Sequence, residues 1–346
     1  MLNAVPMAEV TRGGFVESIH LGHAVIARAD GRIVESWGNP DIVTLPRSSA
    51  KMIQALPLLE SGAGADLSSE HLALACASHS GERRHVDRVS RWLLDIGLDD
   101  TALKCGPQTS RDAALANEMI RADAPVTRLF NNCSGKHTGF LALAKHQGAD
   151  LNYVDPDHPV QLAVREAFEV VTDALSPGFG IDGCSAPNFA TTLTGLARAM
   201  AVFAEAREDG PVRMRAAARL RNAMMAHPEL VAGKDRAGSN LMSAATDPVV
   251  IKSGAEGVYV AVLPNQGLGV ALKIADGASR ASEAAIAAML VRLGVLDARH
   301  PMVSRYLDCP ILNRDGLVTG AVRPVSELFA SGFSPDEVFP RIALQK

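Results

Sequence analysis

Residues 46–51 (PRSSAK) carry a hydroxyl and an amine at a spacing that could do chemistry. Ser48 and Lys51 stand three residues apart, so a helix would place both side chains on one face, about one turn apart. A serine becomes a good nucleophile only when a neighbouring base removes its proton, and a desolvated lysine amine can be that base. Ser-x-x-Lys is the nucleophile motif of penicillin-recognising acyl enzymes. The alternative is an ordinary helix start, with Ser48 as its cap and Lys51 in solvent.

Two further polar segments would complete such a site if the chain brings them beside Ser48. Residues 78–82 (SHSGE) follow an apolar run, which is typical of a loop that faces a cleft, and here we single out Ser80. Residues 252–254 (KSG) end a predicted strand and supply Lys252. In penicillin-recognising enzymes a serine loop and a Lys-Thr/Ser-Gly strand complete the site that Ser-x-x-Lys begins. Taken singly, Ser80 could be a turn hydroxyl bonded to its own backbone, and Lys252 could be a strand-end lysine in solvent.

Two Cys-Ser dipeptides, each preceded by polar residues, form a second constellation at Cys133 and Cys184. Thiolates are soft ligands suited to zinc, and two loops could bring the two cysteines together. From this chemistry alone, His137 or Asp182 would supply the remaining ligands. The alternative is two buried free cysteines, which are common in protein cores. A disulfide is the poorer alternative, because the five cysteines are an odd number and we find no signal peptide at the N-terminus.

Composition limits the class of protein. The chain has 346 residues, of which 47% are hydrophobic and 21% charged, so it can bury a large core and disorder is not expected. The net charge of -4 gives no basic excess for nucleic acid or for an anionic membrane surface. No apolar stretch reaches the roughly 18 residues that a membrane-spanning helix needs. We therefore expect a cytoplasmic protein that acts on a small molecule and binds neither nucleic acid nor membrane.

Strand patterns lie near both ends of the chain and helix patterns lie between them. Strands are predicted over 13–45, where Asp30-Gly31 marks a hairpin turn, and again over 249–274. Helices are predicted for a series of segments between and after these strands: 48–59 (disturbed by Pro57), 85–96, 112–122, 138–147, 158–174, 189–207, 211–227 and 279–293.

This order of elements predicts one discontinuous antiparallel sheet with a helical lobe looped out of its middle. We expect a single domain over 1–346, with a sheet lobe at about 10–45 and 245–346 and a helical lobe at about 46–244. The first and last hairpins would pair with each other. Prolines and the Asp315-Gly316 pair indicate only turns and short elements in the tail from about residue 300.

Six ordered segments together resemble the asparaginase II family, the rhizobial-type (class 3) L-asparaginases. They are 46–51 (PRSSAK), 76–82 (CASHSGE), 105–108 (CGPQ), 132–137 (NCSGKH), 182–187 (DGCSAP) and 252–257 (KSGAEG). The resemblance runs from about residue 13 to about residue 290 or beyond, and the number of ordered motifs makes it specific. It implies a serine-β-lactamase-like fold of the α/β (α+β) class and hydrolysis of L-asparagine to L-aspartate and ammonia.

The resemblance also implies particular site residues. They are two Ser–Lys pairs, Ser48 with Lys51 and Ser80 with Lys252, and a zinc site formed by Cys133, Lys136 and Cys184. Lysine is an unusual zinc ligand because it must be neutral to bind, and the residues alone do not point to it. Ser253 stands where the family usually has threonine, but the hydroxyl is kept.

In the expected reaction Ser48 attacks the side-chain amide carbon and Lys51 takes its proton, while Ser80 and Lys252 support the proton relay. Three further residues have expected roles: Arg47 could hold the substrate carboxylate, His137 could contact substrate, and Asp182 could orient the Lys136 amine. Their respective alternatives are an ion pair, a core or surface histidine, and a turn residue.

We expect a homodimer that uses Zn²⁺. One rival prediction is a β-lactamase or peptidase-type acylase, which would need a location in the cell envelope. The other is a catalytically silent ligand-binding protein with structural zinc.

Overall fold

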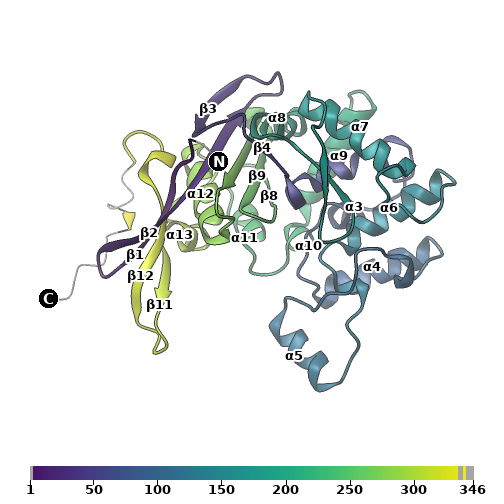
Figure 1. Ribbon diagram of the computed structural model, residues 1–346, viewed down its shortest axis with the longest axis horizontal. Helices are drawn as coiled ribbons and strands as arrows, with labels where there is room; N and C mark the ends of the chain where they lie inside the picture. Colours follow the sequence, from purple (N-terminus) through teal and green to yellow (C-terminus); the bar gives the residue numbers. More distant parts are fainter. Residues whose placement is uncertain (1–2, 334–337, 340–346) are drawn as a thin grey trace.

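The structure is a computed structural model that describes residues 3–333 and 338–339. Its centre is one antiparallel sheet in the order β11-β12-β1-β2-β10-β9-β8, with β3 paired to β2 (Figure 1). The strands of this sheet are β1 (Val5–Arg12), β2 (Phe15–Ala27), β3 (Ile33–Trp37), β8 (Val250–Ser253), β9 (Val258–Leu263), β10 (Leu268–Ile274), β11 (Cys309–Leu312) and β12 (Val318–Pro324).

Most of the helices lie to one side of this sheet and come from the middle of the chain (Figure 1). The α-helices are α1 (Lys51–Gln54), α2 (Leu56–Glu60), α3 (Ser69–Ala75), α4 (Arg83–Asp95), α5 (Ala113–Arg121), α6 (Ser134–His146), α7 (Pro159–Thr172), α8 (Leu193–Ala204), α9 (Val212–Ala226), α10 (Pro228–Val231), α11 (Ala237–Ser243), α12 (Ser279–Arg292) and α13 (Pro301–Leu307). Two short strand pairs join β4 (Val43–Thr44) to β7 (Thr191–Thr192) and β5 (Phe179–Ile181) to β6 (Pro187–Phe189).

The predicted pairing of the first and last hairpins is confirmed. Strand β2 runs antiparallel to β10, in register from Ala27 opposite Gly269 to Gly22 opposite Ile274. Helix α8 packs on one face of the sheet and α12 on the other, so β8, β9 and β10 are buried almost throughout. At Gly269 a side-chain Cβ would lie 2.0 Å from the carbonyl oxygen of Ala197, so glycine lets the α8 backbone lie directly against β10.

Several local predictions need correction. The helix predicted over 48–59 begins with a 3₁₀ turn, η1 (Arg47–Ala50), and is then broken at Ala55, two residues before Pro57. The helix predicted over 189–207 is shorter, because 187–189 is a strand paired with the nearby β5 and 191–192 is a strand paired with the distant β4. Within the described residues no helix is both long and apolar enough to cross a membrane.

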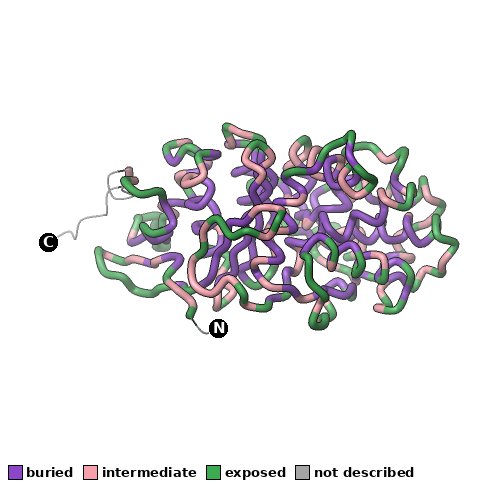
Figure 2. Tube along the Cα trace, turned by 90° about the horizontal axis from the view of Figure 1, so that it is seen from above, coloured by how far each residue is buried: buried purple, intermediate pink, exposed green. Residues whose placement is uncertain are grey.

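Buried residues run through the whole length of the molecule, from the sheet into the helical lobe (Figure 2). Two lysines are among the largest fully buried side chains: Lys51 is 1% exposed and Lys252 is 2% exposed. Burying a charged lysine costs folding free energy unless the lysine is paired or becomes neutral. A buried lysine in a core therefore indicates a functional site. The ends of the predicted 1–346 domain, at 1–2, 334–337 and 340–346, lie outside the described residues.

Candidate active site

The candidate nucleophile Ser48 sits on η1, between the sheet and the helical lobe. A 3₁₀ helix has three residues per turn, so the side chains of Ser48 and Lys51 eclipse each other. The Ser48 side chain is half-buried and makes no hydrogen bond to any residue that the structure describes. The neighbouring Ser49 is fully buried, and its hydroxyl donates to the carbonyl oxygen of Pro46 at 2.7 Å. Ser48 is therefore the available hydroxyl of this pair.

The Lys51 amine is hydrogen-bonded to two backbone carbonyl oxygens. Its Nζ donates to Ala77 O, at the end of the α3 segment, and to Asn132 O at 3.5 Å, just before α6. A neutral amine has two N–H donors and one lone pair. In that neutral form, two donors turned toward carbonyls would leave the lone pair to accept a proton.

Lys252 is the second buried amine, and it comes from strand β8. Its Nζ donates to Ser78 Oγ at 2.8 Å and to Ser253 O at 2.9 Å. Burial, and after it the positive charge of Lys51, holds the pKa of Lys252 well below the usual range of a lysine. Lys51 and Lys252 thus come from distant parts of the chain and are both buried, and burial favours the neutral form of Lys252.

The expected pair of Ser80 with Lys252 is not the one formed. The hydroxyl bonded to Lys252 belongs to Ser78, whereas Ser80 Oγ donates to Ala232 O at 3.1 Å. A Cβ on Gly233 would lie 2.2 Å from Ser80 Oγ, so Ser80 fastens the segment after α10 closely against the 78–82 loop. The sequence alone gave no basis for choosing Ser78.

Arg47 and Asp182 form an ion pair beside the nucleophile. Arg47 Nη2 lies 2.8 Å from Asp182 Oδ1, and this hydrogen bond raises the pKa of the guanidinium. The backbone of Arg47 is left-handed, with φ of 53°, and its N–H donates to Asn188 Oδ1 at 3.1 Å. A left-handed residue other than glycine is strained and needs such support. The ion pair matches the structural alternative for Arg47; a contact between Arg47 and substrate stays a prediction.

Cys133, Lys136 and Cys184 meet at one point. Cys133 caps the start of α6 and Lys136 lies one turn later, while Cys184 belongs to the loop between β5 and β6. Lys136 Nζ lies 3.2 Å from Cys184 Sγ, and a hydrogen bond from Cys133 is the main cause of the lowered pKa of Cys184. Two cysteine sulfurs and an amine are a donor set that suits zinc when both thiols are deprotonated and the amine is neutral.

The other ligands considered for zinc lie differently. No group of three or more His, Cys, Asp and Glu side chains in the described part of the chain is arranged to hold a metal ion. Asp182 is engaged by Arg47, although its charge still acts on Lys136. His137 is fully buried, with Nδ1 2.9 Å from Tyr153 Oη, as a core histidine would be. A contact between His137 and substrate stays a prediction.

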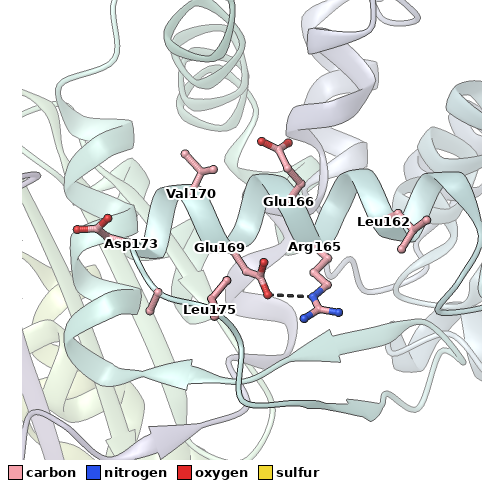
Figure 3. A pocket seen from close by; sticks show the side chains of 8 residues that line it. Leu162, Arg165, Glu166, Glu169, Val170, Asp173 and Leu175 are labelled. Atoms are coloured by element: carbon pink, nitrogen blue, oxygen red, sulfur yellow. Dashed lines mark hydrogen bonds and ion pairs between the residues drawn. The ribbon is translucent and has the colours of Figure 1, made fainter.

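A hollow on the outer face of α7 is separate from these residues (Figure 3). It encloses about 550 Å³ and contains the Arg165–Glu169 ion pair, at 2.9 Å. Its lining residues include no serine, cysteine or lysine, so it lacks the nucleophile and the amine bases found around Ser48.

Comparison with known proteins gives a family and a set of distant structures. The model of the L-asparaginase II family matches residues 8–324. Comparison with curated proteins gives no match. A class C β-lactamase from Rhodobacter sphaeroides is 14% identical, with 76% of this chain and 92% of that chain covered and a TM-score of 0.40. A β-lactamase from Mycobacterium bovis is 12% identical, with 78% and 94% covered and a TM-score of 0.35.

The native form of Mglu is 14% identical, with a TM-score of 0.43; the match covers 80% of this chain but 65% of Mglu. The predicted antiparallel sheet with an inserted helical lobe is confirmed by the order of the elements in the structure itself. The family match spans nearly the whole chain and includes all six segments singled out from the sequence. The chain belongs to the L-asparaginase II family and is an asparaginase-type amidohydrolase.

Proposed function

We propose that this protein hydrolyses L-asparagine to L-aspartate and ammonia through an acyl-enzyme on Ser48. The observation that carries the proposal is the half-buried Ser48 on a 3₁₀ turn, three residues before the buried amine of Lys51. This turn packs against β8, the strand that supplies the buried amine of Lys252. Family membership supports the reaction class, and the arrangement of hydroxyl and amine supports the mechanism.

In the first half of the reaction the Ser48 oxygen attacks the carbon of the substrate's side-chain amide. Lys51, as a neutral amine, accepts the hydroxyl proton on its free lone pair. Ser78 and Lys252 form the adjoining relay, because burial favours the neutral form of Lys252 and its amine is hydrogen-bonded to Ser78 Oγ. A proton returned to the leaving nitrogen releases ammonia. Water then cleaves the ester, and the same amines take and return its proton.

We propose that Cys133, Lys136 and Cys184 hold a zinc ion. When bound, zinc acts as a Lewis acid that can polarise a carbonyl oxygen. The contribution of the chain itself is to gather the three donors: α6 fixes the first two, and the turn between β5 and β6 brings the third to within 3.2 Å of the Lys136 amine. We also retain a homodimeric state and a cytoplasmic location as predictions.

The proposal is tested by measuring ammonia release from L-asparagine with the wild type and Ser48→Ala. We expect turnover by the wild type and a loss of about a thousandfold or more in the variant. Near-normal turnover by Ser48→Ala would remove Ser48 as the nucleophile. Hydrolysis of nitrocefin without ammonia release would reassign the protein to the β-lactamase class, and asparagine binding without turnover would make it a silent binding protein.

A further inference from the structure

Arg111 lies at the edge of the catalytic site and has no role in the reaction described so far. Its backbone N–H donates to Ser80 O at 2.8 Å, and the hydroxyl of the preceding Ser110 donates to the same carbonyl at 3.4 Å. These two bonds fix the start of the Arg111 side chain beside the 78–82 loop, which also carries Ser78. The side chain itself is exposed, so a dissolved molecule can reach it.

The charge of Arg111 reaches the groups around the nucleophile. Burial is the main cause of the lowered pKa of both Lys252 and His79, and the positive charge of Arg111 lowers each pKa further. Arg111 is therefore an exposed cation whose backbone is held against the 78–82 loop, the loop that supplies Ser78.

Arg111 has no acidic partner. Within residues 3–333 and 338–339 its guanidinium takes part in no ion pair and in no side-chain hydrogen bond. The charged side chain that acts on it most strongly is another cation, Arg236, which adds to the effect of burial in lowering the pKa of Arg111. Arg47, by contrast, already holds the carboxylate of Asp182 at 2.8 Å. Compared with Arg47, Arg111 has its planar fork of donors free.

We propose that Arg111 binds a free carboxylate of the substrate, opposite the amide that Ser48 attacks. This inference rests on the proposed function, since it adds a specificity element to the same site. A guanidinium pairs with a carboxylate through two parallel hydrogen bonds, which fixes orientation as well as affinity. A carboxylate placed there would also relieve the repulsion between Arg111 and Arg236. The substrates are then amides that carry a free carboxylate, and amides without one are poor substrates.

The first test is direct binding and needs no turnover. Isothermal titration calorimetry would measure the affinity of L-aspartate for the wild type, Arg111→Gln and Arg111→Lys. Arg83→Gln is the matched control, because Arg83 is an exposed arginine paired with Glu118 on the surface. We expect binding about 10- to 100-fold weaker in Arg111→Gln, partly recovered in Arg111→Lys, and unchanged in the control. Failure of the wild type to bind L-aspartate, or equal binding by Arg111→Gln, would overturn the assignment.

The second test compares two substrates. L-Asparagine and 3-aminopropanamide share the reacting amide and the amine, but only the first has a carboxylate. We expect Arg111→Gln to raise KM for L-asparagine about 10- to 100-fold and to change kcat/KM for 3-aminopropanamide by less than about twofold. An equal loss on both substrates would show a structural role and refute the assignment. Binding of L-aspartate that depends on Arg111, with no ammonia released by the wild type, would refute the proposed function and leave the carboxylate site standing.

Discussion

Gly254 directly follows the strand that carries Lys252, and it packs against the start of the turn that carries Ser48. A Cβ added at this position would lie 2.6 Å from Pro46 O and 3.0 Å from Val258 Cβ. The first distance is about 0.8 Å shorter than the 3.4 Å at which ordinary contact begins. Because the atom met is backbone, Gly254→Ala can relieve the overlap only by moving η1 away from β8.

The size of the effect follows from that displacement. A misplacement of about 1 Å at a catalytic group can cost about 100-fold in rate, so we expect kcat/KM for L-asparagine to fall by about that factor. Overpacking of this kind costs about 1 to 3 kcal/mol of stability. With an unfolding entropy of about 2.1 cal/mol/K per residue, a 346-residue chain would then lose about 1 to 4 °C in Tm.

The assay is ammonia release beside a thermal melt, with Gly238→Ala as the control. Gly238 lies in α11 and packs on the same strand, where a Cβ would lie 3.5 Å from Ile251 O, an ordinary contact. This helical glycine should accept alanine with full activity and an equal or higher Tm. A Gly254→Ala enzyme with lowered Tm but wild-type kcat/KM would refute the reasoning that the contact between Gly254 and Pro46 sets the catalytic geometry.

Three further outcomes are expected. Ser78→Ala should lose most activity with little change in Tm. Ser80→Ala should keep most activity but lower Tm, because the Ala232 carbonyl loses its hydrogen bond. The reverse pattern in paired melts and activity assays would favour the Ser80–Lys252 pair instead. Lys252→Met should abolish activity and raise stability at pH 7, because the pKa of this amine is lower in the folded wild type than in the unfolded chain, which therefore binds the proton more tightly. This gain in stability should shrink as the pH rises toward the unfolded pKa of about 10.4. Wild-type activity should fall as the pH is lowered through the reduced pKa of Lys252. Stability and activity that do not vary with pH would contradict these two expectations. Elemental analysis should find zinc in the wild type purified without chelator and little in Cys184→Ser, and its absence from the wild type would count against the metal site.

The sheet could be predicted where strands pair locally, and less well elsewhere. The Asp30-Gly31 turn and the alternating run around it identify β2 and β3 by themselves. Strand β1 carries Pro6, which reads as a strand breaker, but the proline sits at a register shift between β1 and β2 where the ladder is already interrupted. Strands β11 and β12 both contain a proline, and β12 is paired with β1 at the other end of the chain, so local pattern says little about where they lie in the sheet.

The candidate site, too, could be predicted from the sequence where the relation between residues is local, and less well where it depends on distant segments. Ser48 and Lys51 are recognisable because their relation is local and survives the change from an α-helix to a 3₁₀ turn. The partner of Lys252 depends on how a loop and a distant strand meet, so the sequence could indicate the loop but not the hydroxyl. Arg111 lies outside every motif, and only its position beside Ser80 brings it into view.

The most direct test of the central claim is to trap the acyl-enzyme. Wild-type protein would be mixed with L-asparagine and quenched in acid, and its peptides would be examined by mass spectrometry. We predict an aspartyl ester on the peptide that contains Ser48, and none in the Ser48→Ala variant. An adduct on another residue, or rapid turnover by Ser48→Ala, would contradict the account.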